Sequence, residues 1–193
     1  MTQPLGALRR PGGRPLGGRG LLELAGQLDA QFAAQARPPG VLERRAYRIA
    51  GRPVEVLSPS RALLEAWLGS LAPWAQRTSE ESPRLSLRLF EAPPGTDPLA
   101  GAAAELRTLL LQGEMVTDLA RCAHAHAEGG TLSLFDREAH QAILLHMSRH
   151  SLPAWERAAP LRTVLQWWSE SGGAQLVHAA GVGVDETGAL IVG

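Results

Sequence analysis

The most constraining feature of this sequence is its last stretch, residues 174–193, which reads AQLVHAAGVGVDETGALIVG. Residues 175–185 are rich in valine and small side chains, and residues 186–188 form a short loop that contains a glycine. Glycine adopts positive φ angles without steric cost, so this loop predicts a tight turn. Residues 189–192 are a short apolar run, which is typical of a strand buried on both faces. The stretch therefore predicts a β-hairpin.

The predicted second strand leads into Gly193. A buried apolar strand that runs into glycine is how a phosphate-binding loop begins when G-x-x-x-x-G-K-[ST] and a helix follow. All 19 basic residues are arginine, so the sequence contains no lysine. Gly193 is thus a candidate first glycine of a nucleotide-binding loop. The alternative is a strand that simply ends in glycine, as many strands do.

Residues 153–193 resemble bacterial P-loop kinases related to HPr kinase/phosphorylase, a group described as serine kinase-like. The resemblance is carried by ERAAPLR at 156–162, LQWW at 165–168, LVHAA at 176–180 and GALIVG at 188–193. In that family a strand with His-Ala or His-Gly pairs with a Gly-x-Leu-Ile/Leu-x-Gly strand that enters the nucleotide loop. Before residue 153 the match is loose.

The resemblance implies a fragment of a larger kinase. The chain would be the N-terminal portion, ending at the start of the Walker A loop. The complete protein would transfer the γ-phosphoryl group of ATP to a hydroxyl group of a protein or peptide substrate, with Mg²⁺ as the metal ion. Since the glycine-rich loop, its lysine and an aspartate base would follow residue 193, we expect this chain alone to be inactive and to hold neither ATP nor Mg²⁺.

His178 is the candidate catalytic residue. It lies in the strand beside the one that would feed the phosphate loop. In the HPr kinase family a histidine precedes the same pair of strands and lies close to the bound phosphate. An imidazole nitrogen at that place can donate to a phosphate oxygen or hold a proton near it. The alternative is a histidine whose ring is satisfied within the sheet.

The predicted fold class is α+β. A disordered Arg/Gly/Pro-rich tail (1–20) precedes an N-terminal α+β domain (21–150), which has a small mixed or antiparallel sheet with helices. Residues 151–193 would be the opening helix and β-hairpin of a P-loop kinase domain of the PEP carboxykinase-like type, as the resemblance implies. The helix around residues 161–170 would pack beneath the hairpin, and its adjacent Trp167 and Trp168 are not expected to face the core together.

Local patterns predict the elements of residues 21–150. Residues 21–36 form an amphipathic helix with Leu21, Leu24, Leu28 and Phe32 on one stripe. Residues 45–58 alternate as a hairpin, Ser58 and Ser60 supply an N-cap, and a helix over 61–76 is ended or kinked by Pro73. Residues 84–91 are the cleanest alternating strand, and 121–147 predict a meander. Residues 105–119 are ambiguous: the spacing of Leu106, Leu109, Leu110 and Met115 is compatible with a helix, whereas the resemblance favours a loop and a strand there.

Three further groups of residues are weighed as sites. His124 and His126 share one strand face, and together with His140 and His146 they are weighed as a metal cluster, but no cysteine or carboxylate stands at a matching interval. No metal is therefore expected, and solvated strand faces are the alternative. Cys122 is expected to be a buried small hydrophobe. The residues Glu156, Arg157 and Arg162 form either a surface ion-pair cluster or the lining of a groove for a polypeptide substrate.

Overall composition leaves a second functional class open. The formal net charge is +0, which argues against binding to nucleic acid or to an anionic membrane surface. A single cysteine fits a reducing, cytoplasmic compartment, and no apolar run approaches the roughly 20 residues of a membrane-spanning helix. The alternative to a kinase is a non-catalytic module that binds a peptide or a partner. An exposed sheet edge would permit a homo-oligomer.

Overall fold

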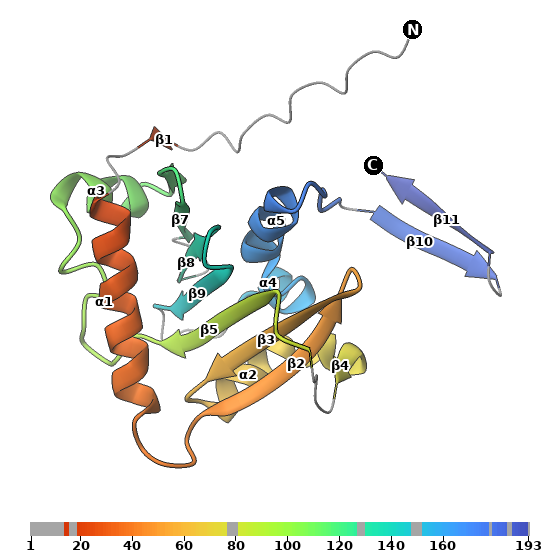
Figure 1. Ribbon diagram of the computed structural model, residues 1–193, viewed down its shortest axis with the longest axis horizontal. Coiled ribbons are helices and arrows are strands. Elements are labelled where there is room, and N and C mark those ends of the chain that lie inside the picture. Colours follow the sequence, from red (N-terminus) through yellow and green to blue (C-terminus); the bar gives the residue numbers. More distant parts are fainter. Residues whose placement is uncertain are drawn as a thin grey trace, which may run out of the picture.

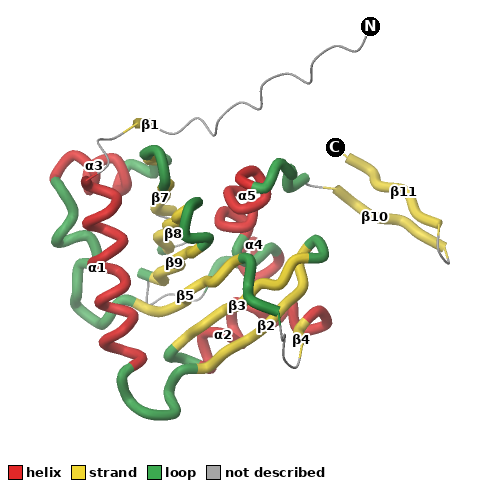
Figure 2. The backbone as a smooth tube through the Cα atoms, in the orientation of Figure 1, coloured by secondary structure: helices red, strands yellow, loops and turns green. Residues whose placement is uncertain are grey.

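The computed structural model describes residues 14–15, 19–76, 81–126, 130–147, 152–177, 179–184 and 187–192, with backbone only for residues 74, 76 and 179–192. Within these residues the fold is mixed α/β. One mixed sheet of nine strands carries helices on both faces, and a separate sheet has two strands (Figures 1 and 2). No helix in the described ranges is long and apolar enough to cross a membrane.

The large sheet has the strand order β1-β6-β7-β8-β9-β5-β3-β2-β4. The strands are β1 (Arg14–Pro15), β2 (Glu43–Ile49), β3 (Arg52–Ser58), β4 (Ala75–Gln76), β5 (Leu85–Glu91), β6 (Val116–Thr117), β7 (Arg121–His126), β8 (Thr131–Asp136) and β9 (Gln141–His146). The predicted hairpin (β2–β3) and the meander (β7–β8–β9) are confirmed as antiparallel pairs. The pairs β3–β5 and β5–β9 are parallel, which makes the sheet mixed.

The register places the carboxyl ends of four strands at one border of the sheet. β3, β5 and β9 are mutually parallel, and β7 runs with them because it is antiparallel to β8, which is antiparallel to β9. These strands end at Ser58, Glu91, His146 and His126. We call this border the carboxyl edge. In open α/β sheets, ligands bind in the crevice outside the carboxyl ends of the strands.

One face of the sheet is covered by α1 (Arg19–Ala36) and α3 (Ala104–Leu111) (Figure 1). The predicted stripe of α1 is confirmed, since Leu21, Leu24, Leu28 and Phe32 are its buried residues. The ambiguous residues 105–119 form most of α3 and then β6, so the loop expected in the first part of this stretch is wrong. Arg14–Pro15 pairs with β6, and α1 begins at Arg19, so these parts of the predicted tail belong to regular elements. The rest of the tail lies outside the described residues.

The opposite face is covered by α2 (Arg61–Leu68), the 3-10 helix η1 (Gly69–Trp74), α4 (Ala154–Ala158) and α5 (Arg162–Ser171). The predicted N-cap is confirmed, because the Ser60 hydroxyl accepts a hydrogen bond from the Leu63 backbone N–H at 3.2 Å. The helix predicted over 61–76 ends at Leu68, and the chain continues as η1 with Pro73 inside it. Proline fits this tighter, shorter turn because it removes a donor that an α-helix would need.

α5 packs on the large sheet against β8 rather than beneath the C-terminal hairpin. The expectation for its tryptophans is wrong: Trp167 and Trp168 are 4% and 3% exposed and belong to one core cluster. Adjacent helical residues are about 100° apart, so both can bury when the covered arc of the helix is wide. The Trp168 ring also donates its Nε1–H to the Arg84 carbonyl at 3.2 Å.

The same core crosses the domain boundary predicted between residues 150 and 151. Leu152, Leu161, Val164 and Leu165 lie in one cluster with side chains of β3, β5, β7, β8 and β9. Residues 152–171 therefore contribute their helices to the covering layer of the preceding sheet.

The predicted C-terminal hairpin is confirmed as β10 (Ala179–Val184) and β11 (Thr187–Val192). The two strands are antiparallel over six residue pairs, from Ala179↔Val192 to Val184↔Thr187. The boundaries differ from the prediction: Gly188 lies in β11 rather than in the turn, and β10 begins at Ala179 rather than at Gln175. The hairpin forms its own sheet and lies beyond α5 in Figure 1.

Candidate functional site

The two residues that the sequence selects for nucleotide chemistry, His178 and Gly193, lie outside the described residues. Their chain neighbours are described. Ala179, which follows His178, is the register partner of Val192, which precedes Gly193. Ala179 and Val192 thus form the register pair at the end of the hairpin opposite its turn.

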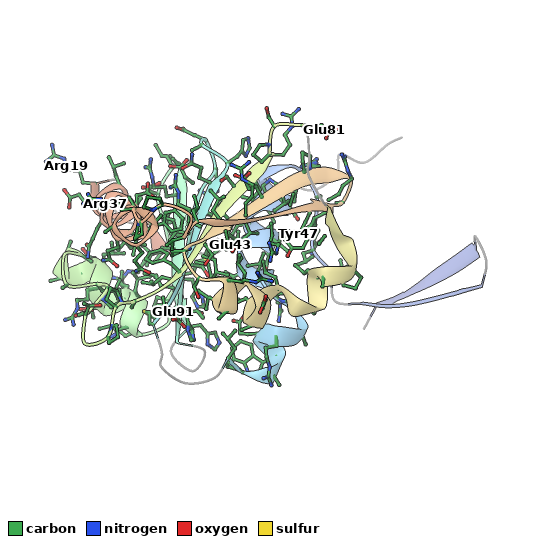
Figure 3. The ribbon with its side chains drawn as sticks, turned by 90° about the horizontal axis from the view of Figure 1, so that it is seen from below. Arg19, Arg37, Glu43, Tyr47, Glu81 and Glu91 are labelled. Carbon is green, nitrogen blue, oxygen red and sulfur yellow. The ribbon has the colours of Figure 1, made fainter. Side chains whose placement is uncertain are left out.

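A second group of polar side chains crosses the carboxyl edge of the large sheet. His126 pairs in register with Thr131, Thr131 with His146, and His146 with Glu91. We call these four residues the polar row. Thr131 and His146 are buried, at 3% and 5% exposed, whereas the Glu91 side chain is 57% exposed (labelled in Figure 3). The row is therefore buried in the middle of the sheet and opens to solvent at β5.

His124 and Ser133 form the next register pair on the same face. The rings of His124 and His126 lie 6.1 Å apart, and the His126 ring lies 4.8 Å from the ring of Trp155 on α4. Burial lowers the pKa of His124, and the neighbouring His126 lowers it further, against a hydrogen bond to the Gly113 backbone. His124 is therefore biased toward its neutral form.

The metal cluster considered for the four histidines does not form. His140 is exposed, in the turn before β9 with φ 50°, while His146 ends that strand. Among the described residues, no three His, Cys, Asp or Glu side chains are grouped so that they could hold a metal ion. That the protein binds no metal stays a prediction.

His146 is packed between a carboxylate and an indole. Its Nδ1 lies 3.5 Å from Glu91 Oε1, which is too long for a good hydrogen bond, and its ring meets the Trp67 ring edge-on at 6.1 Å. Both His146 Nδ1 and Trp67 Nε1 are buried without a hydrogen-bond partner in the described part of the chain. Two unsatisfied polar atoms on touching rings mark this place as unusual for a core.

A small cavity of about 10 Å³ lies beside Trp67. It is lined by Trp67, Ser133, Leu144, Glu156, Leu161, Arg162, Thr163 and Val164. Burial raises the pKa of Glu156, and the nearby His126 and Arg162 oppose that rise. Glu156 and Arg162 therefore meet at this half-buried cavity rather than in a purely surface cluster.

A larger groove of about 450 Å³ lies between η1, α5 and the segment that leads to the hairpin. Its lining residues are Ser70, Leu71, Ala158, Ala159, Pro160, Arg162, Leu165, Gln166, Leu176 and Val177. Leu176 and Val177 are 43% and 47% exposed, so the groove presents apolar side chains to solvent. Of the three residues predicted to line a groove, Arg162 does so, and it also lines the small cavity.

Cys122 is a buried hydrophobe, as predicted. Its side chain is 0% exposed, and burial raises the pKa of its thiol to about 12. A thiol with that pKa is protonated at neutral pH and does not act as a nucleophile.

Sequence reasoning missed Trp67, Ser133 and Glu91 as members of a site. The available signal was polar residues at core-facing positions of predicted strands. Thr131 and Ser133 alternate with Leu132 and Leu134, and buried hydroxyl groups in an apolar strand need a reason. The pairing that aligns them with His126 and His146 comes from long-range register, which local patterns do not contain.

Comparisons with known proteins return no match: no family model, no curated protein and no solved structure matches the chain.

Proposed function

We propose that this chain is the N-terminal portion of an ATP-dependent protein or peptide serine kinase that resembles HPr kinase. The complete protein would transfer the γ-phosphoryl group of ATP, with Mg²⁺, to a hydroxyl group. The observation that carries the proposal is the register of the C-terminal hairpin, in which Ala179 pairs with Val192. The kinase would act in the cytoplasm.

The register supports the proposal because a phosphate loop needs a fixed strand before it. Backbone N–H groups bind phosphate only when the preceding strand and following helix hold them in a nest. Six consecutive pairs fix β11 against β10 as far as Val192. In the proposal, Gly193 opens the nucleotide loop, and His178 lies beside the bound phosphate.

The packing of α5 also supports the proposal. Trp167 and Trp168 anchor this helix in the core of the large sheet, and a short segment leads from its end to β10. Catalytic groups are positioned best when rigid elements carry them. A hairpin that follows an anchored helix meets that requirement better than one at the end of a long linker.

The coding sequence that follows residue 193 tests this proposal without any biochemistry. The proposal requires a continuing reading frame in which Gly-Lys-Ser or Gly-Lys-Thr appears within about seven residues of Gly193, as the loop motif demands. A frame that continues without this motif, or a stop codon, contradicts the kinase proposal.

The groove favours a second candidate, a non-catalytic module that binds a peptide or a partner protein. Its volume of about 450 Å³ falls within the range of about 300–1,000 Å³ typical of ligand sites, and Arg162 is the charged residue in an otherwise mostly apolar lining. A kinase would use the same groove to dock its protein or peptide substrate. A stop codon after residue 193, together with peptide binding that Arg162→Gln weakens, would favour the binding module over the kinase.

A further inference from the structure

We infer that the groove between η1, α5 and residues 176–177 is a docking site for an amphipathic helix of a partner protein. The apolar stripe of that helix lies in the groove, and an acidic side chain beside the stripe pairs with the Arg162 guanidinium. The inference rests on the peptide-binding role proposed above for the groove, and it does not depend on the assignment as a kinase. Three features of the lining carry it: exposed apolar side chains, one charged group, and no residue from a strand.

The groove presents large apolar side chains to solvent. Leu176 and Val177 are 43% and 47% exposed, and Leu71 and Leu165 line the same groove. Apolar side chains that adjoin one another at a surface, rather than being scattered over it, mark an interaction site. The groove has a volume of about 450 Å³, so it has room for several apolar side chains of a partner.

Arg162 supplies the charge to which the occupant must be complementary. It is exposed, it is the first residue of α5, and it is the charged group in the lining. The helical positions i+3 and i+4 from it hold Leu165 and Gln166, so no carboxylate pairs with it along α5. Glu156 lies near enough for the two charges to interact, but among the described residues no carboxylate forms an ion pair with Arg162. An acidic side chain of the occupant would supply that partner.

The occupant must satisfy its own backbone hydrogen bonds. The lining residues lie in η1, α4, α5 and the segments next to these helices, and none of them lies in a strand. An extended peptide gains main-chain hydrogen bonds by adding to a sheet edge, and this lining offers none. A helix makes its backbone hydrogen bonds internally and needs only apolar contact from the groove. The lining therefore suits an amphipathic helix.

Selection from a displayed library of helical peptides, about 14 residues long, tests the inference on the 193-residue chain without a known partner. We expect enriched peptides to carry large apolar residues at i, i+3 or i+4, and i+7, with one aspartate or glutamate beside this stripe. Selection on Arg162→Gln should enrich the stripe without the acidic residue. Arg157→Gln is the matched control, because it removes the same charge from an exposed arginine outside the groove lining, and it should leave the acidic residue enriched.

The outcomes of the selection separate this inference from the roles proposed above. Enriched peptides that lack the acidic residue on the wild-type chain would overturn the inference and leave a peptide-binding role for the groove. Absence of any enriched peptide would overturn both the inference and that role. The kinase proposal is decided independently, by the coding sequence after residue 193.

Fluorescence anisotropy with one selected peptide tests the charge pair directly. Replacing the acidic residue of the peptide with its amide should weaken binding to the wild-type chain about fivefold. The same replacement should not change binding to Arg162→Gln, because the pair is already missing there. Leu176→Ser should weaken binding of both peptides about tenfold, since it removes an apolar side chain from the groove wall. An equal loss on the wild-type chain and on Arg162→Gln would contradict the pairing.

Light scattering on the chain without peptide tests the competing occupant, a second copy of this chain. We expect the same molecular mass for the wild-type chain and for Leu176→Ser, because Leu176 lies in a groove that a partner protein fills. A dimer of the wild-type chain that Leu176→Ser dissociates would show that a second copy fills the groove, and it would overturn the inference.

Discussion

At the residue scale, burial sets the chemistry of Cys122. The side chain lies on β7 in the core that α2 and α5 cover, and burial raises the pKa of its thiol from the ordinary 9.0 to about 12. The neighbouring Arg137 lowers the pKa, but its effect is smaller than that of burial. The thiol is therefore a packing group, and its ionisation is coupled to unfolding.

We predict that stability falls as the pH rises from about 9 to about 12. In this window the unfolded chain releases the Cys122 proton and the folded protein retains it, so higher pH favours unfolding. The stabilisation lost is at most about 4 kcal/mol, from three pKa units at about 1.4 kcal/mol each.

Urea unfolding at several pH values would measure the slope of the free energy of unfolding against pH. The chain has no lysine and one tyrosine, so few other side chains titrate in this range. The single tyrosine, Tyr47, contributes in the same direction, because burial also raises its pKa. Cys122→Ala is the control, and it should flatten the slope. Equal slopes in both proteins would show that Cys122 is not the titrating group.

Trp168 provides a second prediction at the residue scale. Trp168→Phe removes the hydrogen bond to the Arg84 carbonyl, weakens the contact with the Arg52 guanidinium 5.7 Å from the ring, and leaves a space in the core. We expect a loss of about 2–3 kcal/mol in the free energy of unfolding. Trp155→Phe, at a side chain 47% exposed, should cost less than about 1 kcal/mol. Similar losses in the two variants would contradict the described environment of α5.

At the element scale, α1 depends on one apolar stripe. We predict that Leu28→Ala costs about 2–5 kcal/mol, because Leu28 is 0% exposed in the core between α1, α3 and the sheet. Leu22→Ala is the matched control on the same helix, where the side chain is 53% exposed, and it should cost less than about 1 kcal/mol. Thermal or urea unfolding would measure the stability of both variants. A Leu22→Ala variant as unstable as Leu28→Ala would show that the buried face of the helix is assigned wrongly.

An element can be predicted from the sequence when the residues that determine it lie close together in the chain. The stripe of α1 and the alternation of Leu85, Leu87 and Leu89 in β5 are set by neighbours a few residues away, and both were predictable. The parallel pairs β3–β5 and β5–β9 join segments far apart in the sequence, with other elements between them. Local periodicity carries no information on such pairing, so the carboxyl edge and its polar row were not predictable.

The burial of α5 illustrates the same limit. The helical period was predictable from the spacing of Val164, Leu165 and Trp168. The width of the buried face of the helix depends on the elements that surround it. The Trp168 ring reaches the Arg84 carbonyl, and Trp167 adds to the same core. Only the tertiary structure shows that both indoles are covered.

At the scale of the whole molecule, residues 152–171 are part of the body formed by the preceding sheet. Six of them are buried in its core: Leu152, Leu161, Val164, Leu165, Trp167 and Trp168. Burial of a large apolar side chain stabilises a fold by about 1.5–3 kcal/mol. The gross stabilisation from six such side chains is therefore comparable with the net stability of a typical domain, about 5–15 kcal/mol.

We therefore predict that a chain ending at residue 150 does not unfold cooperatively, whereas a chain ending at residue 177 keeps a melting temperature within a few degrees of the complete chain. The second truncation removes the hairpin sheet but none of the six core side chains. Calorimetry on both truncated chains is the measurement. A cooperative transition in the 1–150 chain would contradict this prediction and support a separate domain that ends at residue 150.

We propose that the C-terminal hairpin leads the chain into a nucleotide site. The direct measurement is transfer of the γ-phosphoryl group of Mg·ATP to a serine-containing protein or peptide. Transfer by the full-length protein that contains this chain is compared with transfer by the 193-residue chain. We predict transfer by the full-length protein, a loss of about 100-fold in that transfer on His178→Ala, and no transfer above blank by the 193-residue chain. Transfer by the 193-residue chain alone, or none by the full-length protein with any serine substrate tested, would contradict it.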